Sequence, residues 1–109
     1  MSILGKVSLL NEITNKLSWL AAKSSVHSQN IALGDTPNYQ RQEIREFKDL
    51  LSSKGTLTLG PQAIKSSTEN VSKEWEVMAQ AEAAAQHQAM VGTYKKYMSL
   101  LKTVMGVHS

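Results

Sequence analysis

Histidines and carboxylates are the residues in this chain that could act as metal ligands or acid–base catalysts. The three histidines, His27, His87 and His108, are widely separated. Neither Glu76 nor Glu82 forms with His87 the H-E-x-x-H spacing that places two imidazoles on one face of a helix to bind zinc. A single histidine on a helix is more often packed or solvated than catalytic. We therefore predict no metal site and no catalytic residue.

Phosphate-binding loops and activated nucleophiles are not indicated either. Gly55 and Gly60 lack the further residues of a P-loop or of a dinucleotide-binding fingerprint, and no serine lies in a G-x-S-x-G motif. The chain contains no cysteine, which excludes disulfides, thiol chemistry and cysteine-ligated metals. The sequence thus predicts that the protein is not an enzyme and binds no cofactor.

The charge balance gives little support to a nucleic-acid or membrane partner. Twelve basic and nine acidic residues give a net charge of +3, and the basic residues are scattered with no block longer than Lys95-Lys96. Such scatter is typical of a solvated surface. No stretch is apolar enough to span a bilayer, and the N-terminal residues lack the pattern of a cleaved signal peptide. The residues alone favour a cytosolic protein that neither inserts into a membrane nor binds nucleic acid.

The apolar residues fall into patterns that predict long helices. Hydrophobic residues make up 41% of the chain but aromatic residues only 6%, a composition that suits contacts between helices. Trp19 and Trp75 are expected to be core or interface anchors. Over residues 4–33, apolar or small residues alternate at spacings of three and four, which draws one stripe along a helix. The stripe contains Leu10, Ile13, Leu17, Leu20, Ser24, His27 and Ile31.

A second helix is predicted from about residue 71 onward. Ser72 is a suitable N-cap, and Glu74 and Glu76 lie in the positively polarised first turn. Several alanines would let another helix approach closely, and Gly92 indicates a tight crossing or a small bend. The predicted contact face contains Val77, Ala81, Ala84, Gln88, Val91, Tyr94 or Lys95, Met98, Leu101 and Met105.

Between the two helices the patterns are weaker. Residues 40–51 bring Ile44, Phe47 and Leu50 to helical spacing, which predicts a short amphipathic helix. Residues 52–70 are rich in Ser, Thr, Gly and Lys and indicate an exposed, irregular loop in which only 56–59 could form a short strand. We therefore predict an all-α fold in which two long helices form an antiparallel, coiled-coil-like hairpin. Its three segments are residues 1–34, 35–70 and 71–109.

The junction that ends the first helix carries the most specific motif. Gly34 can adopt the left-handed conformation that closes a helix, and Pro37 pushes the preceding residue out of the helical region, so the chain turns here. The order of residues in this turn resembles the N-I-A-N-x-x-T-P-G-Y signature of bacterial flagellar rod and hook proteins. Leu33 and Asn38 depart from it, because asparagine and glycine are usual at those positions. The matching residues are Asn30, Ile31, Ala32, Asp35, Thr36, Pro37 and Tyr39.

A second segment carries the same resemblance. Asn70-Val71 with Glu74, Glu76 and Met78 is similar to the N-V-D-x-E-x-E-M region of proximal rod proteins, and the short middle segment favours the proximal rod over relatives that carry whole domains there. The resemblance implies a structural subunit of the flagellar basal body, exported without a cleaved signal by the flagellar type III apparatus to the periplasmic rod, which transmits motor torque. The implied partners are copies of the chain itself, other rod subunits, the adaptor that joins the rod to the membrane ring, and the export gate.

In that setting the apolar stripes of both helices would be buried between subunits as well as within them. We call these positions the assembly seam: Leu10, Ile13, Leu17, Leu20, Ile31, Val77, Ala81, Ala84, Val91, Met98, Leu101 and Met105. Two other interpretations of the same helices remain open. One is a cytosolic helical-hairpin adaptor or secretion chaperone that binds a partner helix. The other is a nucleic-acid-binding helical protein, whose affinity for DNA would fall steeply with added salt.

Overall fold

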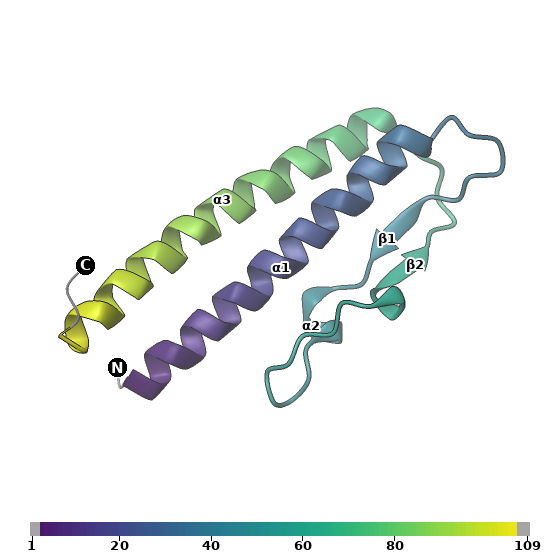
Figure 1. The fold of residues 1–109 in the computed structure, drawn as a ribbon. Helices are drawn as coiled ribbons and strands as arrows, with labels where there is room; N and C mark the ends of the chain where they lie inside the picture. The colour runs from purple at the N-terminus through teal and green to yellow at the C-terminus, as the bar shows by residue number, and fades with distance from the viewer. Residues whose placement is uncertain (1–2, 107–109) are drawn as a thin grey trace.

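The computed structural model describes residues 3–106, and two long helices account for most of them (Figure 1). Helix α1 spans Ile3–Leu33 and helix α3 spans Lys73–Val104. They run antiparallel and side by side, so the molecule is an elongated hairpin that measures 58 × 27 × 17 Å along its principal axes. The prediction of two long helices at the two ends of the chain is confirmed. Among residues 3–106, no helix combines the length and hydrophobicity that crossing a bilayer requires.

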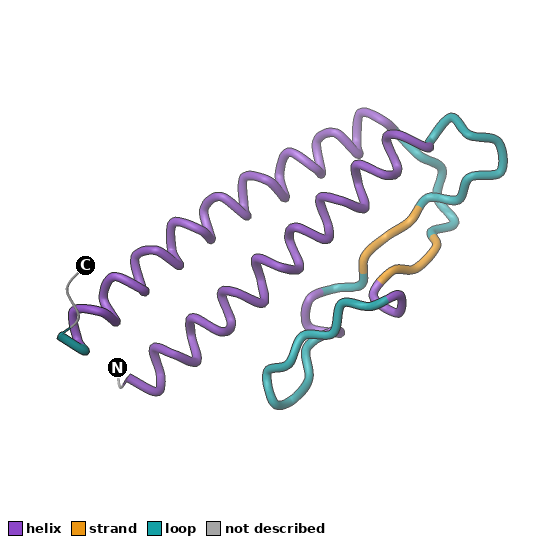
Figure 2. The backbone as a smooth tube through the Cα atoms, in the orientation of Figure 1, coloured by secondary structure: helices purple, strands orange, loops and turns teal. Residues whose placement is uncertain are grey.

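The segment between the helices forms a thin third layer that lies along α1 (Figure 2). It contains strand β1 (Gln42–Ile44), the single-turn helix α2 (Phe47–Leu50), the 3₁₀ turn η1 (Pro61–Ala63) and strand β2 (Ile64–Ser66). The two strands pair antiparallel, with Gln42 opposite Ser66 and Ile44 opposite Ile64. The fold is therefore mostly helical, but the small sheet means that it is not all-α as predicted.

Two predictions for the middle segment are wrong. Residues 40–51 are not one amphipathic helix, because only 47–50 are helical and Glu46 before them is extended, with φ −61° and ψ 147°. Residues 52–70 are not irregular throughout, since they contain η1 and β2. The possible strand at 56–59 is reduced to a single bridge between Leu57 and Leu51. Pairing with residues distant in the sequence outweighs the local helical spacing here.

A small apolar core joins the third layer to α1. The indole N–H of Trp19 donates a hydrogen bond to the backbone carbonyl of Arg45 at 2.9 Å, and its ring meets Phe47 edge-to-face with 6.0 Å between centroids. Trp19 is therefore a core anchor, as predicted, whereas Trp75 is 52% exposed. The buried residues of this core are Trp19, Leu20, Leu50 and Ala63, with Ile44, Phe47 and Leu57 packed against them.

Helix α3 begins as predicted. The hydroxyl of Ser72 accepts a hydrogen bond from the backbone N–H of Trp75 at 3.4 Å, and Glu74 and Glu76 occupy the first turn. The cap satisfies one of the free N–H groups at the helix start, and the carboxylates face its positive end. The start of α3 after Ser72 fixes the position of Glu76 in the first turn of the helix.

Two glycines respond oppositely to an added methyl group, which gives a direct test of the packing. Gly34 does not adopt the left-handed conformation predicted for it, because the positive φ in this turn is at Asn38. A Cβ at Gly34 would lie 2.8 Å from the carbonyl oxygen of Asn30 and 2.8 Å from Cγ1 of Val71, so alanine requires both contacts to shift. A Cβ at Gly92 would meet no atom within 4 Å among residues 3–106, so the tight crossing predicted there is not found within the chain. We expect Gly92→Ala to raise the free energy of unfolding by about 1 kcal/mol, through helix propensity, and Gly34→Ala to lower it. Denaturant unfolding measures both changes, and shifts of the same sign would contradict the packing described.

Candidate functional site

Polar side chains from α1, the turn and α3 converge at the turn end of the hairpin. Although they are polar or charged, each of them is at most 5% exposed. Burying such groups is costly unless they are hydrogen-bonded and their charges are paired, so their positions must be set by one another. We call this group the buried polar cluster, and its members are His27, Asn30, Arg41 and Glu76.

Asn30, the first residue of the turn motif, ties strand β1 to helix α1. Its Oδ1 accepts hydrogen bonds from the backbone N–H of Gln42 at 2.9 Å and from the hydroxyl of Tyr39 at 2.8 Å. Its Nδ2 donates to the backbone carbonyl of Gln42 at 2.9 Å and to Oε1 of Glu76 at 3.2 Å. The amide therefore uses both of its polar atoms twice and pairs with Gln42 as a neighbouring strand would.

Glu76 is fully buried and is the acceptor on which the cluster converges. Its Oε1 lies 2.5 Å from Nε of Arg41, and its Oε2 lies 2.5 Å from Nδ1 of His27. Burial alone would raise the pKa of Glu76, but hydrogen bonds from His27, Arg41 and Asn30, together with the positive charge of Arg41, outweigh it and hold the pKa below its ordinary value. The carboxylate is thus ionised and makes every hydrogen bond as an acceptor.

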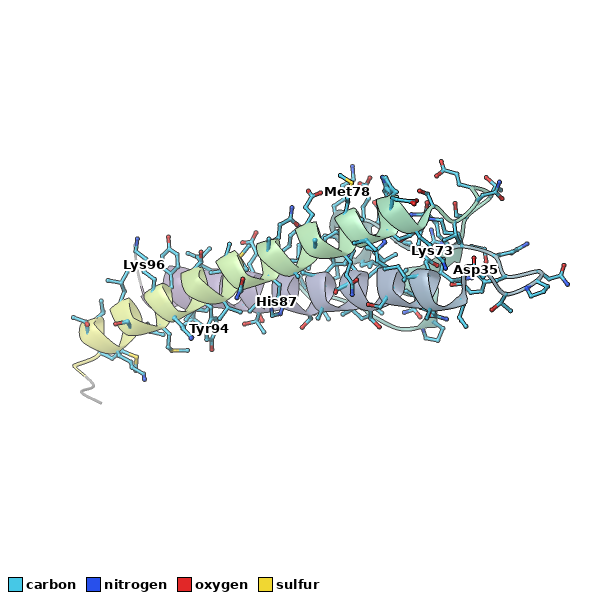
Figure 3. The ribbon with its side chains drawn as sticks, turned by 90° about the horizontal axis from the view of Figure 1, so that it is seen from above. Asp35, Lys73, Met78, His87, Tyr94 and Lys96 are labelled. Carbon is cyan, nitrogen blue, oxygen red and sulfur yellow. The ribbon has the colours of Figure 1, made fainter. Side chains whose placement is uncertain are left out.

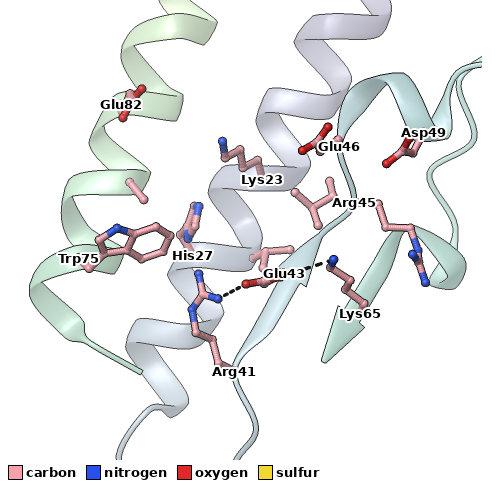
Figure 4. Close-up of a pocket in the computed structure, with 13 residues that line it drawn as sticks. Lys23, His27, Arg41, Glu43, Arg45, Glu46, Asp49, Lys65, Trp75 and Glu82 are labelled. Carbon is pink, nitrogen blue, oxygen red and sulfur yellow. Dashed lines mark hydrogen bonds and ion pairs between the residues drawn. The ribbon is translucent and has the colours of Figure 1, made fainter. Parts of the chain in front are cut away.

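Arg41 links Glu76 to the third layer. Its Nη1 lies 2.5 Å from Oε1 of Glu43 on β1, and Oε2 of Glu43 lies 3.8 Å from Nζ of Lys65 on β2 (Figure 4). Burial works to lower the pKa of Arg41, yet the hydrogen bonds and charges of Glu76 and Glu43 raise it, so the guanidinium stays charged. The pKa of Tyr39 is also raised, first by burial and then by the negative charge of Glu76.

His27 has the geometry of a carboxylate-oriented imidazole. With Nδ1–H donating to Glu76, its Nε2 is buried and finds no hydrogen-bond partner among residues 3–106. The ring of Trp75 meets it edge-to-face at 5.5 Å, and the guanidinium carbon of Arg41 lies 4.6 Å from the Trp75 ring centre. Figure 4 shows these three side chains beside one another. In acid–base triads the free nitrogen of such a histidine faces a nucleophile, whereas Nε2 of His27 has no hydrogen-bond partner among residues 3–106.

A cavity of about 400 Å³ adjoins the cluster and separates it from α2. Among residues 3–106, basic and acidic side chains line it in equal number, and no serine, threonine or cysteine does. No group of three or more His, Cys, Asp or Glu side chains within residues 3–106 is placed to hold a metal ion. The balance of charges gives no preference for an anionic or a cationic ligand. The charged lining residues are Lys23, Arg41, Arg45, Lys65, Glu43, Glu46, Asp49 and Glu82.

The remaining motif residues shape the turn. The backbone N–H of Thr36 donates to the carbonyl of Leu33 at 2.9 Å, and the N–H of Tyr39 donates to the carbonyl of Thr36 at 3.1 Å. Asn38 has a φ of 65°, the left-handed conformation in which glycine is usual and asparagine is next best. Asp35 pairs with Lys73 at the start of α3, with 2.5 Å between Oδ2 and Nζ, at the surface. Ile31 is half-buried, and Ala32 and Pro37 are exposed.

The α1 part of the assembly seam lies mostly against the rest of the chain. Leu10, Ile13 and Leu20 are buried, and Leu17 and Ile31 are half-buried. The predicted stripe therefore describes the inner face of α1 well. His27, which also lies on that stripe, packs inside the hairpin as part of the buried polar cluster.

The α3 part of the assembly seam is not the face that packs inside the hairpin. In Figure 3, His87 and Tyr94 lie on one side of α3, whereas Met78 points to the opposite side. The buried residues of α3 are Glu76, Ala83 and Leu101. Of the predicted seam, only Leu101 is buried and Val91 and Met98 are half-buried, whereas the exposed members are Val77, Ala81, Ala84 and Met105.

The sequence pattern predicts Glu76 in the first turn of α3 and His27 on the α1 stripe, but it does not predict that the two side chains meet. The available signals were a histidine among apolar stripe residues and an acidic residue one position before Val77. Neither signal predicts that His27 contacts Glu76, because the pairing of residues 49 positions apart depends on the register of the two helices. Nothing in the sequence around Arg41 predicts that its side chain is buried.

The acid titration of Glu76 tests this geometry. Because its pKa is lower in the folded chain than the ordinary 4.5, ionised Glu76 contributes stability that is complete above about pH 4.5 and is lost as the pH falls through the folded-state pKa. Carbon-13 NMR of the glutamate carboxyls should show one of them titrating below the others, and it should be missing in Glu76→Gln. A Glu76 carboxyl that titrates at or above its ordinary pKa would contradict the arrangement.

Comparisons of this chain with protein-family models, with curated proteins and with solved structures find no match.

Proposed function

We propose that the chain is a structural subunit of the bacterial flagellar basal body, most like the proximal rod protein of the FlgB type. Copies would pack through their long helices into the tubular rod that transmits motor torque. The chain would reach the periplasmic rod through the flagellar export gate. Its partners would be copies of itself, other rod subunits and the adaptor between rod and ring.

One observation carries the proposal. The two segments that resemble rod proteins, around Asn30 and around Glu76, are 46 residues apart in the sequence, yet their side chains meet at 3.2 Å in the buried polar cluster. Tyr39, the last residue of the turn motif, bonds to the same Asn30 side chain. An ordinary helix-ending turn would need none of these contacts. The motif residues are thus explained as one interdependent structural unit, which supports a shared origin for both resemblances.

The surface offers apolar contacts of the kind that assembly needs. A soluble monomer exposes few clustered large apolar side chains, and such clusters often mark interaction sites. A groove of about 300 Å³ between α1 and α3 is lined by Leu20, Ala21, Ser24, Ala84 and His87. Ala84 in this groove belongs to the exposed part of the assembly seam. The large apolar residues exposed over the hairpin are Val7, Leu33, Leu59, Trp75, Val77, Met78, Leu100, Val104 and Met105.

A cytosolic helical-hairpin adaptor or secretion chaperone is the second candidate, because the same groove could hold a partner helix. Fractionation separates the two functions. A rod subunit co-purifies with detergent-extracted basal bodies, and cells without it lack rods. An adaptor or chaperone remains in the cytosolic fraction and is absent from the purified basal bodies, which would refute the rod assignment.

A further inference from the structure

The side of α3 that faces away from α1 carries an ordered set of exposed residues, and one of them, Glu82, also lines the cavity of about 400 Å³. Met78 and Lys96 point to the same side of α3 in Figure 3, opposite His87 and Tyr94. Residues spaced by three or four along a helix share such a face. We call it the outer face, and it consists of Met78, Glu82, Ala85, Ala89, Gly92, Lys96 and Leu100, all of them exposed.

The outer face is unusual for a solvated surface. The face of a helix opposite the core is normally polar. Here its two ends are large apolar residues, Met78 at 71% and Leu100 at 43% exposure, and its only charges are Glu82 and Lys96. A Cβ at Gly92 would meet no atom of the described residues within 4 Å, so the centre of the face is open to a second backbone.

The order of these residues is self-complementary when the helix is reversed. Glu82 lies seven residues before Ala89 and Lys96 seven residues after it, while Met78 lies eleven before and Leu100 eleven after. Two antiparallel copies of α3 that cross at Ala89 would therefore place Glu82 of each copy against Lys96 of the other. They would also place Met78 against Leu100 at both ends. A parallel pair would instead set like charges against each other.

We propose that two copies of the chain associate through the outer face, antiparallel, with the two-fold axis at Ala89. The small side chains at the centre let the backbones approach, the two ion pairs fix the register, and the apolar ends are removed from water. Such an isologous contact closes at two copies and cannot propagate. It is centred on a different side of α3 from the exposed assembly-seam residues Val77 and Ala84, whereas Ala81, three residues from Met78 and four from Ala85, lies at its edge. The dimer does not rest on the proposed function.

Cysteine cross-linking tests the register cleanly, because the natural chain has no cysteine. Ala89→Cys should form a disulfide-linked dimer under mild oxidation, since the two copies of this residue meet on the axis. Ala85→Cys is the matched control on the same face: in the proposed register the two cysteines are offset by eight residues, about 12 Å along the helix, beyond disulfide reach. Equal cross-linking of both variants, or none at Ala89→Cys, would overturn the register.

Charge reversal tests the association itself. In sedimentation experiments over a range of concentrations, the unaltered chain should show a monomer–dimer equilibrium. Glu82→Lys and Lys96→Glu should each weaken it on the order of tenfold or more, because each turns two attractive pairs into repulsive ones. The double variant Glu82→Lys/Lys96→Glu should restore it. Circular dichroism checks that the helices are retained, as expected for exposed positions.

Three outcomes would overturn the dimer: an unaltered chain that stays monomeric at every concentration, single reversals without effect, or a double variant that is no better than the singles. These outcomes are distinguishable from failure of the rod proposal. If the chain remains monomeric and still co-purifies with basal bodies, only the dimer is refuted. If the chain dimerises as described but is absent from basal bodies, only the rod assignment is refuted.

Discussion

Glu76→Ala is expected to lower the free energy of unfolding by about 3–5 kcal/mol, a large part of the roughly 5–15 kcal/mol that holds a typical domain folded. The reason is what the substitution leaves behind. Arg41, 5% exposed, loses the carboxylate 2.5 Å from its Nε, and His27 and Asn30 lose a shared acceptor. A buried guanidinium without its main counter-charge is far more costly than the loss of the pair's own attraction. Denaturant unfolding followed by circular dichroism measures the change.

Glu43→Ala is the matched control, because Glu43 pairs with the same Arg41 at the same 2.5 Å but has a side chain that is 32% exposed. Water can solvate the part of Arg41 that Glu43→Ala exposes, so this substitution should lower the free energy of unfolding by about 1 kcal/mol or less. Glu76→Gln keeps the side-chain shape and one acceptor oxygen, so its loss in the free energy of unfolding should lie between those of Glu76→Ala and Glu43→Ala. Equal losses for Glu76→Ala and Glu43→Ala would show that burial of the cluster does not determine its contribution.

Leu101→Asp and Leu17→Asp are expected to abolish flagellar assembly and therefore motility. Leu101 is buried against the hairpin and Leu17 is half-buried on α1, so either aspartate brings an unpaired charge into an apolar contact. Ala81→Asp sharpens the test, because Ala81 is exposed and the fold should tolerate the charge. If the exposed part of the assembly seam is buried between subunits, Ala81→Asp should keep the helical spectrum of the isolated chain and still prevent motility.

Gln86→Asp serves as the control for that variant. It places the same charge on an exposed position of α3 that belongs to neither the assembly seam nor the outer face. Motility should be close to normal, because a charge at that position stays in water. Swimming cells with Leu101→Asp, Leu17→Asp and Ala81→Asp would refute the assembly seam.

The sequence predicts the long helices well because their signals are local. The α1 stripe, the Ser72 cap and the turn after Leu33 each depend on residues within one or two helical turns, and the structure contains all three, although the left-handed residue of the turn is Asn38 and not Gly34. The third layer could not be predicted in the same way. Strand β1 is only three residues long, and its ladder is completed by Ser66 and by the side chain of Asn30, neither of which is a neighbour in the sequence.

The inner face of α3 was misplaced for a chemical reason. A hydrophobic pattern starts from Val77 and passes through Ala81 and Ala84, whereas the observed face starts from Glu76 and passes through Ala83. Alanines occupy both faces, so they cannot distinguish the two registers. Glu76 decides between them, and its burial depends on Arg41, His27 and Asn30 being in place. A search for apolar stripes excludes a charged residue such as Glu76 from the centre of a contact between helices.

The most direct test of the rod assignment is a reconstruction of purified basal bodies at side-chain resolution. We expect the proximal rod to contain a layer built from this hairpin, with α1 and α3 along the tube, Trp19 packed against the third layer and Ala81 and Ala84 in contact with a neighbouring subunit. A rod whose density is fully explained by other chains, with this one absent, would contradict it.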